Sequence, residues 1–372
     1  MPVLGTYLLI SFAHEETVVG RVLSLRPLVA LGLISYSAYL WHQPLFAFLR
    51  IRSTAEPADW HYLVLTALSL LAAYLTWRYV EKPFRNRTWL SRSQVFALSV
   101  ATSLLFVLAS VWILLQQGAL SRFSEDQQSL LVKLEKSNYQ TKGFNAVAGK
   151  SLQSSRGLLI VGDSFAQDFF NMAAENGYLK NRDVSAYYIP NACGVVASRK
   201  VDLNDYVSES KRARCTKHPR FEAVQFMANL KKAETVFVVS NWLGWQIEFV
   251  PETLEYLSSK TNATIVIVGG KRFETPRHWS YLGLSALERA QRTVVIPTPL
   301  VMTNNQLGEL LPPTSFIDGY AAFCDKGQRC RVFTPAGDPI SNDGSHLTRE
   351  GARFYGRILI RNTRLKDLLE PN

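Results

Sequence analysis

Apolar side chains are spaced differently in the first 120 residues and in the rest of the chain. Residues 95–115 form a run of 21 residues without a charge. At about 1.5 Å per residue, a helix of that length crosses a hydrocarbon core of about 30 Å. The pattern predicts a transmembrane helix there and two further spans at residues 60–77 and 28–49, the second of them rich in polar and aromatic side chains. Residues 4–13 are apolar but too short to cross alone.

Beyond residue 156, short apolar strands alternate with helical segments. An apolar run from residue 157 ends in a tight turn at Ser164, and residues 165–179 follow with helical spacing. Further strands are expected at 184–189, 235–240, 264–268 and 293–296, with helices at 221–232, 251–259 and 282–290. This alternation predicts a parallel sheet covered by helices on both faces. The polar residues 119–156 are interpreted as a tether with one short helix at most.

Charges on either side of residues 95–115 predict which way this helix crosses. The side before it carries four basic residues: Lys82, Arg85, Arg87 and Arg92. On the other side, Arg122 is soon followed by Glu125 and Asp126. Because basic residues favour the cytoplasmic side, residue 92 is expected in the cytoplasm and residue 120 outside. The C-terminal half is therefore expected to be exported.

Net charge and cysteine placement narrow the classes of partner and site. The net charge of +11 is spread along the chain without a dense basic block, which argues against nucleic acid and suits anionic lipid headgroups or acidic glycans. The cysteine spacing matches no zinc motif, so no metal site is expected. In an exported domain, proximity implies the disulfides Cys193–Cys215 and Cys324–Cys330. Other connectivities, and four free thiols in a cytosolic domain, stay open.

Candidate chemistry begins with Gly-Asp-Ser at residues 162–164. Ser164 follows the first strand, at the sheet edge where parallel sheets place their sites, and the N-terminus of a helix there can stabilise an oxyanion. Asp343 and His346 are three residues apart, so His346 can act as base for Ser164 while Asp343 fixes its tautomer. Alternatively, Asp343 is a loop residue and His346 a surface histidine. Four other candidates have no partner at a matching spacing and are interpreted as surface or structural residues: Asp163, Asp168, His218 and His278.

These two motifs together resemble the SGNH (GDSL-like) hydrolase superfamily over about residues 155–365, and most of all its members fused to acyltransferase-3 proteins. The resemblance implies a flavodoxin-like α/β fold and an oxyanion hole formed by the Ser164 N–H, Gly194 and Asn241. As alternatives, Gly194 serves only a turn and Asn241 caps the next helix. Trp242 and Trp245 are candidates for stacking on a sugar ring or for core residues.

The membrane half carries a second resemblance. Ile-Ser-Tyr-Ser-Ala-Tyr-Leu-Trp-His-Gln-Pro at residues 34–44 and Tyr-Val-Glu-Lys-Pro-Phe-Arg at residues 79–85 resemble the last spans of the acyltransferase-3 family, which O-acylates bacterial surface polysaccharides. Members keep their essential residues in earlier spans, so the chain is expected to be the closing part of a longer bundle or to work with a partner that carries those spans. His42 is a functional candidate because it is ionisable and intramembrane; alternatively it ties neighbouring helices together.

The resulting hypothesis is O-acyl transfer, with acetyl as the expected group, to a lipopolysaccharide, peptidoglycan or other polysaccharide. Acyl-CoA is the expected ultimate donor, and no bound cofactor is expected. The expected domains are a partial membrane bundle (1–92), a transmembrane helix (93–118), a periplasmic tether (119–156) and the catalytic domain (157–372), in a multi-pass protein of the inner membrane. Two alternatives remain: an SGNH esterase that deacylates a glycan, and an inactive, membrane-anchored glycan-binding remnant.

Overall fold

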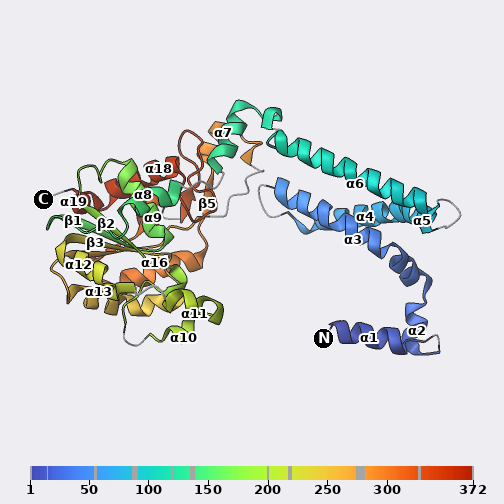
Figure 1. Ribbon diagram of the computed structural model, residues 1–372, viewed down its shortest axis with the longest axis horizontal. Coiled ribbons are helices and arrows are strands. Elements are labelled where there is room, and N and C mark those ends of the chain that lie inside the picture. Colours follow the sequence, from blue (N-terminus) through green and yellow to red (C-terminus); the bar gives the residue numbers. More distant parts are fainter. Residues whose placement is uncertain are drawn as a thin grey trace. The chain divides into compact units, whose positions relative to one another are not determined.

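The computed structural model divides into two compact units, Met1–Phe123 and Ser124–Asn372 (Figure 1). The described residues are 2–14, 16–53, 57–85, 91–118, 120–134, 139–198, 201–216, 220–273, 281–325 and 328–370. Arg87, His218 and His278, which the sequence analysis singled out, lie outside them.

The first unit is helical. Its elements are α1 (Pro2–Phe12), α2 (Val18–Leu23), α3 (Arg26–Arg52), α4 (Asp59–Thr76), the π-helical η1 (Trp77–Glu81), α5 (Lys82–Arg85) and α6 (Arg92–Leu115). In the described part of the chain, two helical stretches are long and apolar enough to cross a membrane, Asp59–Arg85 and Arg92–Leu115. They contain the predicted spans 60–77 and 95–115. The third predicted span lies in α3 and does not meet this criterion, since polar side chains such as His42 and Gln43 lower its hydropathy.

Hydrogen bonds join α3 to the helices that follow it. Trp41 Nε1 donates to Thr76 Oγ1 at 2.9 Å, and the buried Ser37 hydroxyl donates to Glu81. The second bond connects the two segments that resemble the acyltransferase-3 family. Among the described residues His42 forms no such bond, and its Nδ1 lies 3.2 Å from the Ala38 carbonyl oxygen in the same helix. Trp41 and Ser37 therefore tie these helices together.

The second unit is built on a five-stranded parallel sheet in the order β2-β1-β3-β4-β6. Its strands are β1 (Gly157–Gly162), β2 (Val184–Tyr188), β3 (Ala233–Val239), β4 (Thr264–Val268) and β6 (Phe316–Ile317). Every residue of β1 is buried, as an apolar central strand covered on both faces must be. The predicted fold class is confirmed.

Helices cover both faces of this sheet (Figure 1). One face carries α8 (Tyr139–Val147), α9 (Ser164–Glu175) and α18 (Arg349–Asn362), and the other α12 (Val224–Lys232), α13 (Val250–Ser258) and α16 (Thr298–Leu310).

The remaining described elements of the chain are η2 (Leu120–Arg122), α7 (Glu125–Leu134), η3 (Asn191–Cys193), α10 (Leu203–Tyr206), α11 (Glu209–Thr216), η4 (Arg220–Glu222), η5 (Gly244–Phe249), α15 (Ala286–Gln291), β5 (Thr293–Val295), α17 (Gly319–Phe323), β7 (Arg329–Arg331) and α19 (Leu365–Leu369).

One predicted strand lies in a different sheet. The segment 293–296 forms β5, but β5 pairs antiparallel with β7 in a separate two-stranded sheet. Its burial alternates, with Val294 buried between exposed Thr293 and Val295, which suits a ribbon open to solvent on one face. The fifth place in the parallel sheet belongs to β6, whose two residues are too few to show a period in the sequence.

The predicted tether is corrected by the described parts of residues 119–156. Most of them form α7 and α8, which belong to the second unit. Leu130 and Leu134 of α7 are buried one helical turn apart, and Phe144 of α8 is fully buried with its ring edge-on to Phe170. The polar composition of the segment hid these few apolar contacts. The folded domain therefore begins before β1, at α7.

Candidate active site

Ser164 stands where β1 passes into α9, at the carboxyl end of the sheet. The turn requires glycine before it: Gly162 has a φ of +148°, and a Cβ there would lie 1.7 Å from the Val239 carbonyl oxygen. Asp163 caps α9 by accepting a hydrogen bond from the Phe165 N–H. Ser164 is the first helical residue, so its own N–H has no acceptor within α9. That N–H can stabilise negative charge on a ligand beside the hydroxyl.

The structure brings together three predicted residues from opposite ends of the domain. Ser164 Oγ lies 2.9 Å from His346 Nε2, and His346 Nδ1 lies 2.6 Å from Asp343 Oδ2. The second oxygen of Asp343 accepts hydrogen bonds from the N–H groups of Ser345 and His346, both at 2.8 Å. His346 and Asp343 are partly exposed, with 28% and 29% of their side chains accessible. A substrate can therefore reach the pair from solvent.

The ionisation of Asp343 determines what His346 can do. Partial burial favours the neutral acid, but the hydrogen bonds from the His346 ring and from the two backbone N–H groups outweigh it and lower the pKa of Asp343 below its ordinary value. An ionised Asp343 accepts from Nδ1–H of the imidazole. The other ring nitrogen, Nε2, is then the acceptor that faces the Ser164 hydroxyl. The geometry suits removal of a proton from Ser164.

Asp163 connects the three loops around Ser164, although the sequence analysis found no partner for it. It is 1% exposed. Four donors bind its carboxylate: Phe165 N at 2.8 Å, Asn191 Nδ2 at 2.8 Å, Ser240 Oγ at 2.9 Å and Asn241 N at 2.9 Å. Burial raises the pKa of Asp163 against these four hydrogen bonds. Its place as N-cap was visible in the sequence, but its contacts with residues 191, 240 and 241 depend on the fold.

The two other expected oxyanion donors lie on loops that Asp163 holds. Asn191 Nδ2 also donates to the Asn241 carbonyl oxygen at 2.6 Å, so the loops after β2 and β3 are joined directly. The Asn241 side chain is partly exposed at this edge. Gly194 differs from expectation, because its N–H already donates to the Asn191 carbonyl oxygen at 3.0 Å and closes a turn. In this conformation the Gly194 N–H has an acceptor within the protein.

The two tryptophans near Asn241 occupy different environments. Trp242 is 5% exposed, and its Nε1 donates to the Val268 carbonyl oxygen at 2.8 Å, so it is a core residue. Trp245 is half-buried and stacked on Tyr206, with ring centroids 4.6 Å apart. Its ring also packs against Gly194, where a Cβ would meet it at 2.5 Å. Trp245 thus limits how far the Gly194 loop can move.

Two disulfides fix loops of this domain in the pairings expected from the sequence. Cys193 is bonded to Cys215 with Cα atoms 5.2 Å apart, and Cys324 to Cys330 with Cα atoms 4.4 Å apart. The first disulfide joins α11 to the residue before Gly194. Among the described residues, no group of His, Cys, Asp or Glu side chains is arranged to bind a metal ion.

Comparison of the sequence with known protein families identifies the family of this chain. A family model described as "SGNH domain (fused to AT3 domains)" matches residues 136–361, more than half of the chain. The chain belongs to this SGNH family. The match includes α8, as well as Ser164, Asp343 and His346. The resemblance deduced from the Gly-Asp-Ser and Asp-x-x-His motifs is confirmed.

The chain is also similar to named proteins of several bacteria. The chain is 31% identical over 93 residues to the putative peptidoglycan O-acetyltransferase YrhL of Bacillus subtilis, with 25% of this chain and 15% of that protein covered. It is 26% identical over 90 residues to the peptidoglycan O-acetyltransferase OatA of Listeria monocytogenes, with 24% and 14% covered. The O-acetyltransferase OatA of Staphylococcus aureus is 30% identical over 93 residues, with 22% and 15% covered. These matches span about a seventh of the relatives' length.

A solved structure is also similar. It is the periplasmic domain of a lipopolysaccharide acetyltransferase from Salmonella ser. Paratyphi A, which is 14% identical in sequence with a TM-score of 0.41. The similarity covers 62% of this chain and 96% of that one.

Proposed function

We propose that this protein is an O-acyltransferase that places an acetyl group on a hydroxyl of a cell-surface or periplasmic glycan, with Ser164 as nucleophile. The observation that carries the proposal is the pair of hydrogen bonds from Ser164 Oγ to His346 Nε2 and from His346 Nδ1 to Asp343 Oδ2. Such a series activates a hydroxyl for acyl transfer. The names of the relatives, which are O-acetyltransferases, support the same chemistry.

The reaction runs in two half-reactions. Ser164 Oγ attacks the acyl carbon of the donor while its proton passes to His346 Nε2, and that proton then leaves with the departing group. The acyl group is now an ester on Ser164. A sugar hydroxyl attacks this ester, gives its proton to His346, and Ser164 recovers the proton as the C–Oγ bond breaks. Water in place of the sugar would make the same site an esterase.

The oxyanion formed in each half-reaction needs donors beside Ser164. The Ser164 N–H at the start of α9 and the Asn241 side-chain amide are the two proposed donors. Gly194 N–H becomes a third when its bond to the Asn191 carbonyl oxygen opens. Asp163 keeps all three loops in register because it binds Asn191, Asn241 and the first turn of α9.

The proposed acceptor is lipopolysaccharide, peptidoglycan or another polysaccharide, and the ultimate donor is cytoplasmic acyl-CoA. The acyl group would cross the membrane through the helical unit, alone or with further spans. We place this unit in the inner membrane because α6 is apolar on every side and none of its side chains is buried within the protein. The hydrocarbon core of a membrane solvates such a helix. The unit Ser124–Asn372 then lies in the periplasm.

Transfer is tested with the purified full-length chain in detergent. We expect it to move acetyl from a small activated acetyl ester to a peptidoglycan glycan fragment or to an oligosaccharide released from lipopolysaccharide, detected as acetylated sugar by mass spectrometry. Because the sugar competes with water for the acyl-enzyme, adding it should lower the fraction of acetate released. Acetate release that is unchanged by either glycan would identify an esterase instead. If the chain neither transfers acetyl nor hydrolyses the ester, the protein would be a glycan-binding protein rather than an enzyme.

The proposed topology makes its own prediction. A reporter that is active only in the periplasm, fused after residue 372 in a Gram-negative host, should be active. Non-reducing peptide mass spectrometry of the same protein should recover Cys193 linked to Cys215 and Cys324 linked to Cys330, since the periplasm is oxidising. Four free thiols, together with an inactive reporter, would place the domain in the cytoplasm.

A further inference from the structure

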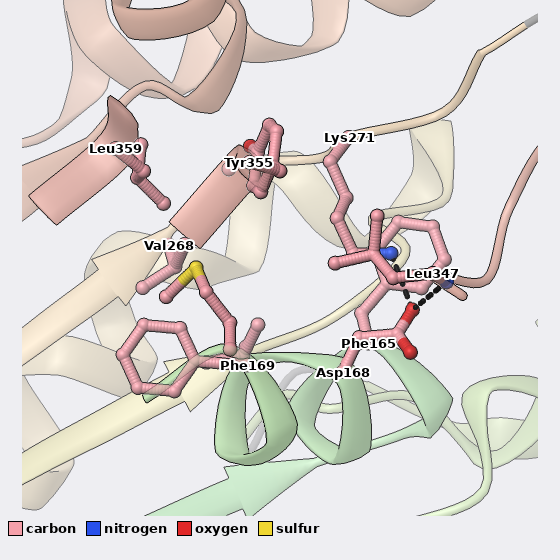
Figure 2. A pocket seen from close by; sticks show the side chains of 11 residues that line it. Phe165, Asp168, Phe169, Val268, Lys271, Leu347, Tyr355 and Leu359 are labelled. Atoms are coloured by element: carbon pink, nitrogen blue, oxygen red, sulfur yellow. Dashed lines mark hydrogen bonds and ion pairs between the residues drawn. The ribbon is translucent and has the colours of Figure 1, made fainter. Parts of the chain in front are cut away.

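A buried ion pair lies beneath the loop that carries His346. Lys271 follows β4 and is 6% exposed, and its Nζ lies 2.5 Å from Oδ2 of Asp168, which is 0% exposed (Figure 2). The cavity beside the pair is otherwise lined mainly by apolar residues, among them Phe169, Val268 and Leu359. Charges in such surroundings are costly because they lose their hydration. The fold therefore keeps an ion pair at a place where apolar side chains could pack equally well.

The pair binds the backbone on both sides of His346. Lys271 Nζ donates to the Ser345 carbonyl oxygen at 2.6 Å, and Asp168 Oδ2 accepts from the Leu347 N–H at 3.2 Å. Ser345 and Leu347 are the two neighbours of His346 in the chain. The dashed lines in Figure 2 mark the bonds from Asp168 to Lys271 and Leu347. The peptide segment that presents the imidazole is thus held at both ends.

The same pair is fixed to the helix that presents Ser164. Asp168 lies four residues after Ser164 on α9, about one helical turn along. Lys271 Nζ also sits 4.1 Å from the ring centroid of Phe165, and that ring is edge-on to the His346 ring at 6.4 Å. The α9 turn and the Phe165 ring therefore connect the ion pair to both the Ser164 hydroxyl and the His346 imidazole, and help to fix their relative positions.

Stability alone does not account for these charges. Replacing a buried ion pair by apolar residues is often neutral or stabilising. Within the described residues, Asp168 Oδ1 has no hydrogen-bond partner, which adds a further cost. The pair instead fixes the path of the loop, because hydrogen bonds to the two backbone groups that flank His346 define that path more narrowly than apolar contacts do.

We propose that Asp168 and Lys271 are positioning residues, which hold the segment Ser345–Leu347 against α9 so that His346 Nε2 meets the Ser164 hydroxyl. The inference rests on the proposed function of Ser164 and His346. Asp168 and Lys271 are both buried and out of reach of a substrate that approaches Ser164 from solvent. Their loss should therefore slow the chemical step and leave substrate binding nearly unchanged.

The test is the full-length double variant Asp168→Ala/Lys271→Met, which removes both bonds to the loop without leaving an unpaired charge. With a small activated acetyl ester, kcat should fall about 100-fold while KM changes by less than about threefold, as a misplacement near 1 Å does. The melting temperature should stay close to that of the parent. Unchanged kcat in a folded double variant would overturn the proposal.

A matched control removes a second ion pair, which is only partly buried. Arg182 Nη2 lies 3.3 Å from Glu234 Oε2, at the amino ends of β2 and β3, away from Ser164. The variant Arg182→Met/Glu234→Gln should keep the parent kcat. If it lost kcat to the same extent as the first double variant, a general loss of packing would explain both, and the positioning role would be wrong.

Two further variants complete the design. If the double variant does not fold, Asp168→Asn/Lys271→Met replaces it, because asparagine still offers an acceptor to the Leu347 N–H. Its kcat should fall about tenfold, since one of the two bonds to the loop remains; no fall would count against the proposal. Ser164→Ala is measured alongside. If Ser164→Ala is active, the proposed nucleophile is wrong. If Ser164→Ala is inactive and the double variant is fully active, only the positioning role is wrong.

Discussion

Replacing Ser164 by alanine should lower kcat for a small activated acetyl ester by about a millionfold, to the residual rate of a site without a nucleophile. The acyl-enzyme cannot form without Oγ, and the helix N-terminus and loop donors then have no tetrahedral intermediate to stabilise. His346→Ala should be nearly as damaging, because an uncharged Ser164 hydroxyl is a poor nucleophile. The double variant should be no worse than either single one, since residues that act as a unit are not additive.

The measurement is steady-state ester hydrolysis by the full-length chain, with covalent labelling of Ser164 by an organophosphonate as a second readout. Ser154→Ala is the matched control: this serine is exposed and lies before β1, at the opposite end of the strand from Ser164. Labelling should disappear in the Ser164 and His346 variants and persist in the control. Wild-type turnover by Ser164→Ala would contradict the mechanism.

Asp343→Asn should lower kcat by about 10⁴-fold, nearly as much as loss of the base itself. An asparagine amide at this place favours the wrong imidazole tautomer, in which Nε2 carries the proton and cannot receive another from Ser164. The ester KM should change little, because Asp343 contacts the histidine and the loop rather than the substrate. A variant with more than a tenth of the parent kcat would exclude this role for Asp343.

The same substitution should change how stability depends on pH. Because hydrogen bonds lower the pKa of Asp343 in the folded protein, its stabilising effect is complete above its unfolded pKa of about 3.9 and is lost as the pH falls toward the folded value. The free energy of unfolding of the parent should therefore fall more steeply below about pH 4 than that of Asp343→Asn. Equal slopes in denaturant titrations at successive pH values would count against an ionised, hydrogen-bonded Asp343.

The sequence allowed four strands of the parallel sheet and the three residues at the centre of the site to be predicted, for identifiable reasons. β1, β3 and β4 are apolar runs bounded by polar turns, and Ser164, Asp343 and His346 each stand beside a recognisable turn or cap. The partners of Asp163 and Asp168 could not be deduced, because they lie at residues 191, 240, 241, 271 and 347 and meet only in the fold. The same limit applies to β6, which is defined by its neighbour β4 rather than by its own two residues.

The helices before β1 also protect an edge of the sheet. Ala148, just beyond α8, forms a parallel bridge with Ala186 of β2, and the Gly149 N–H donates to the Ala186 carbonyl oxygen at 3.0 Å. β2 is the outermost strand on that side. A fragment that started at β1 would leave these backbone groups open and expose the surface under Phe144. Such an edge invites pairing with a strand of another molecule, so the shortened domain would tend to aggregate.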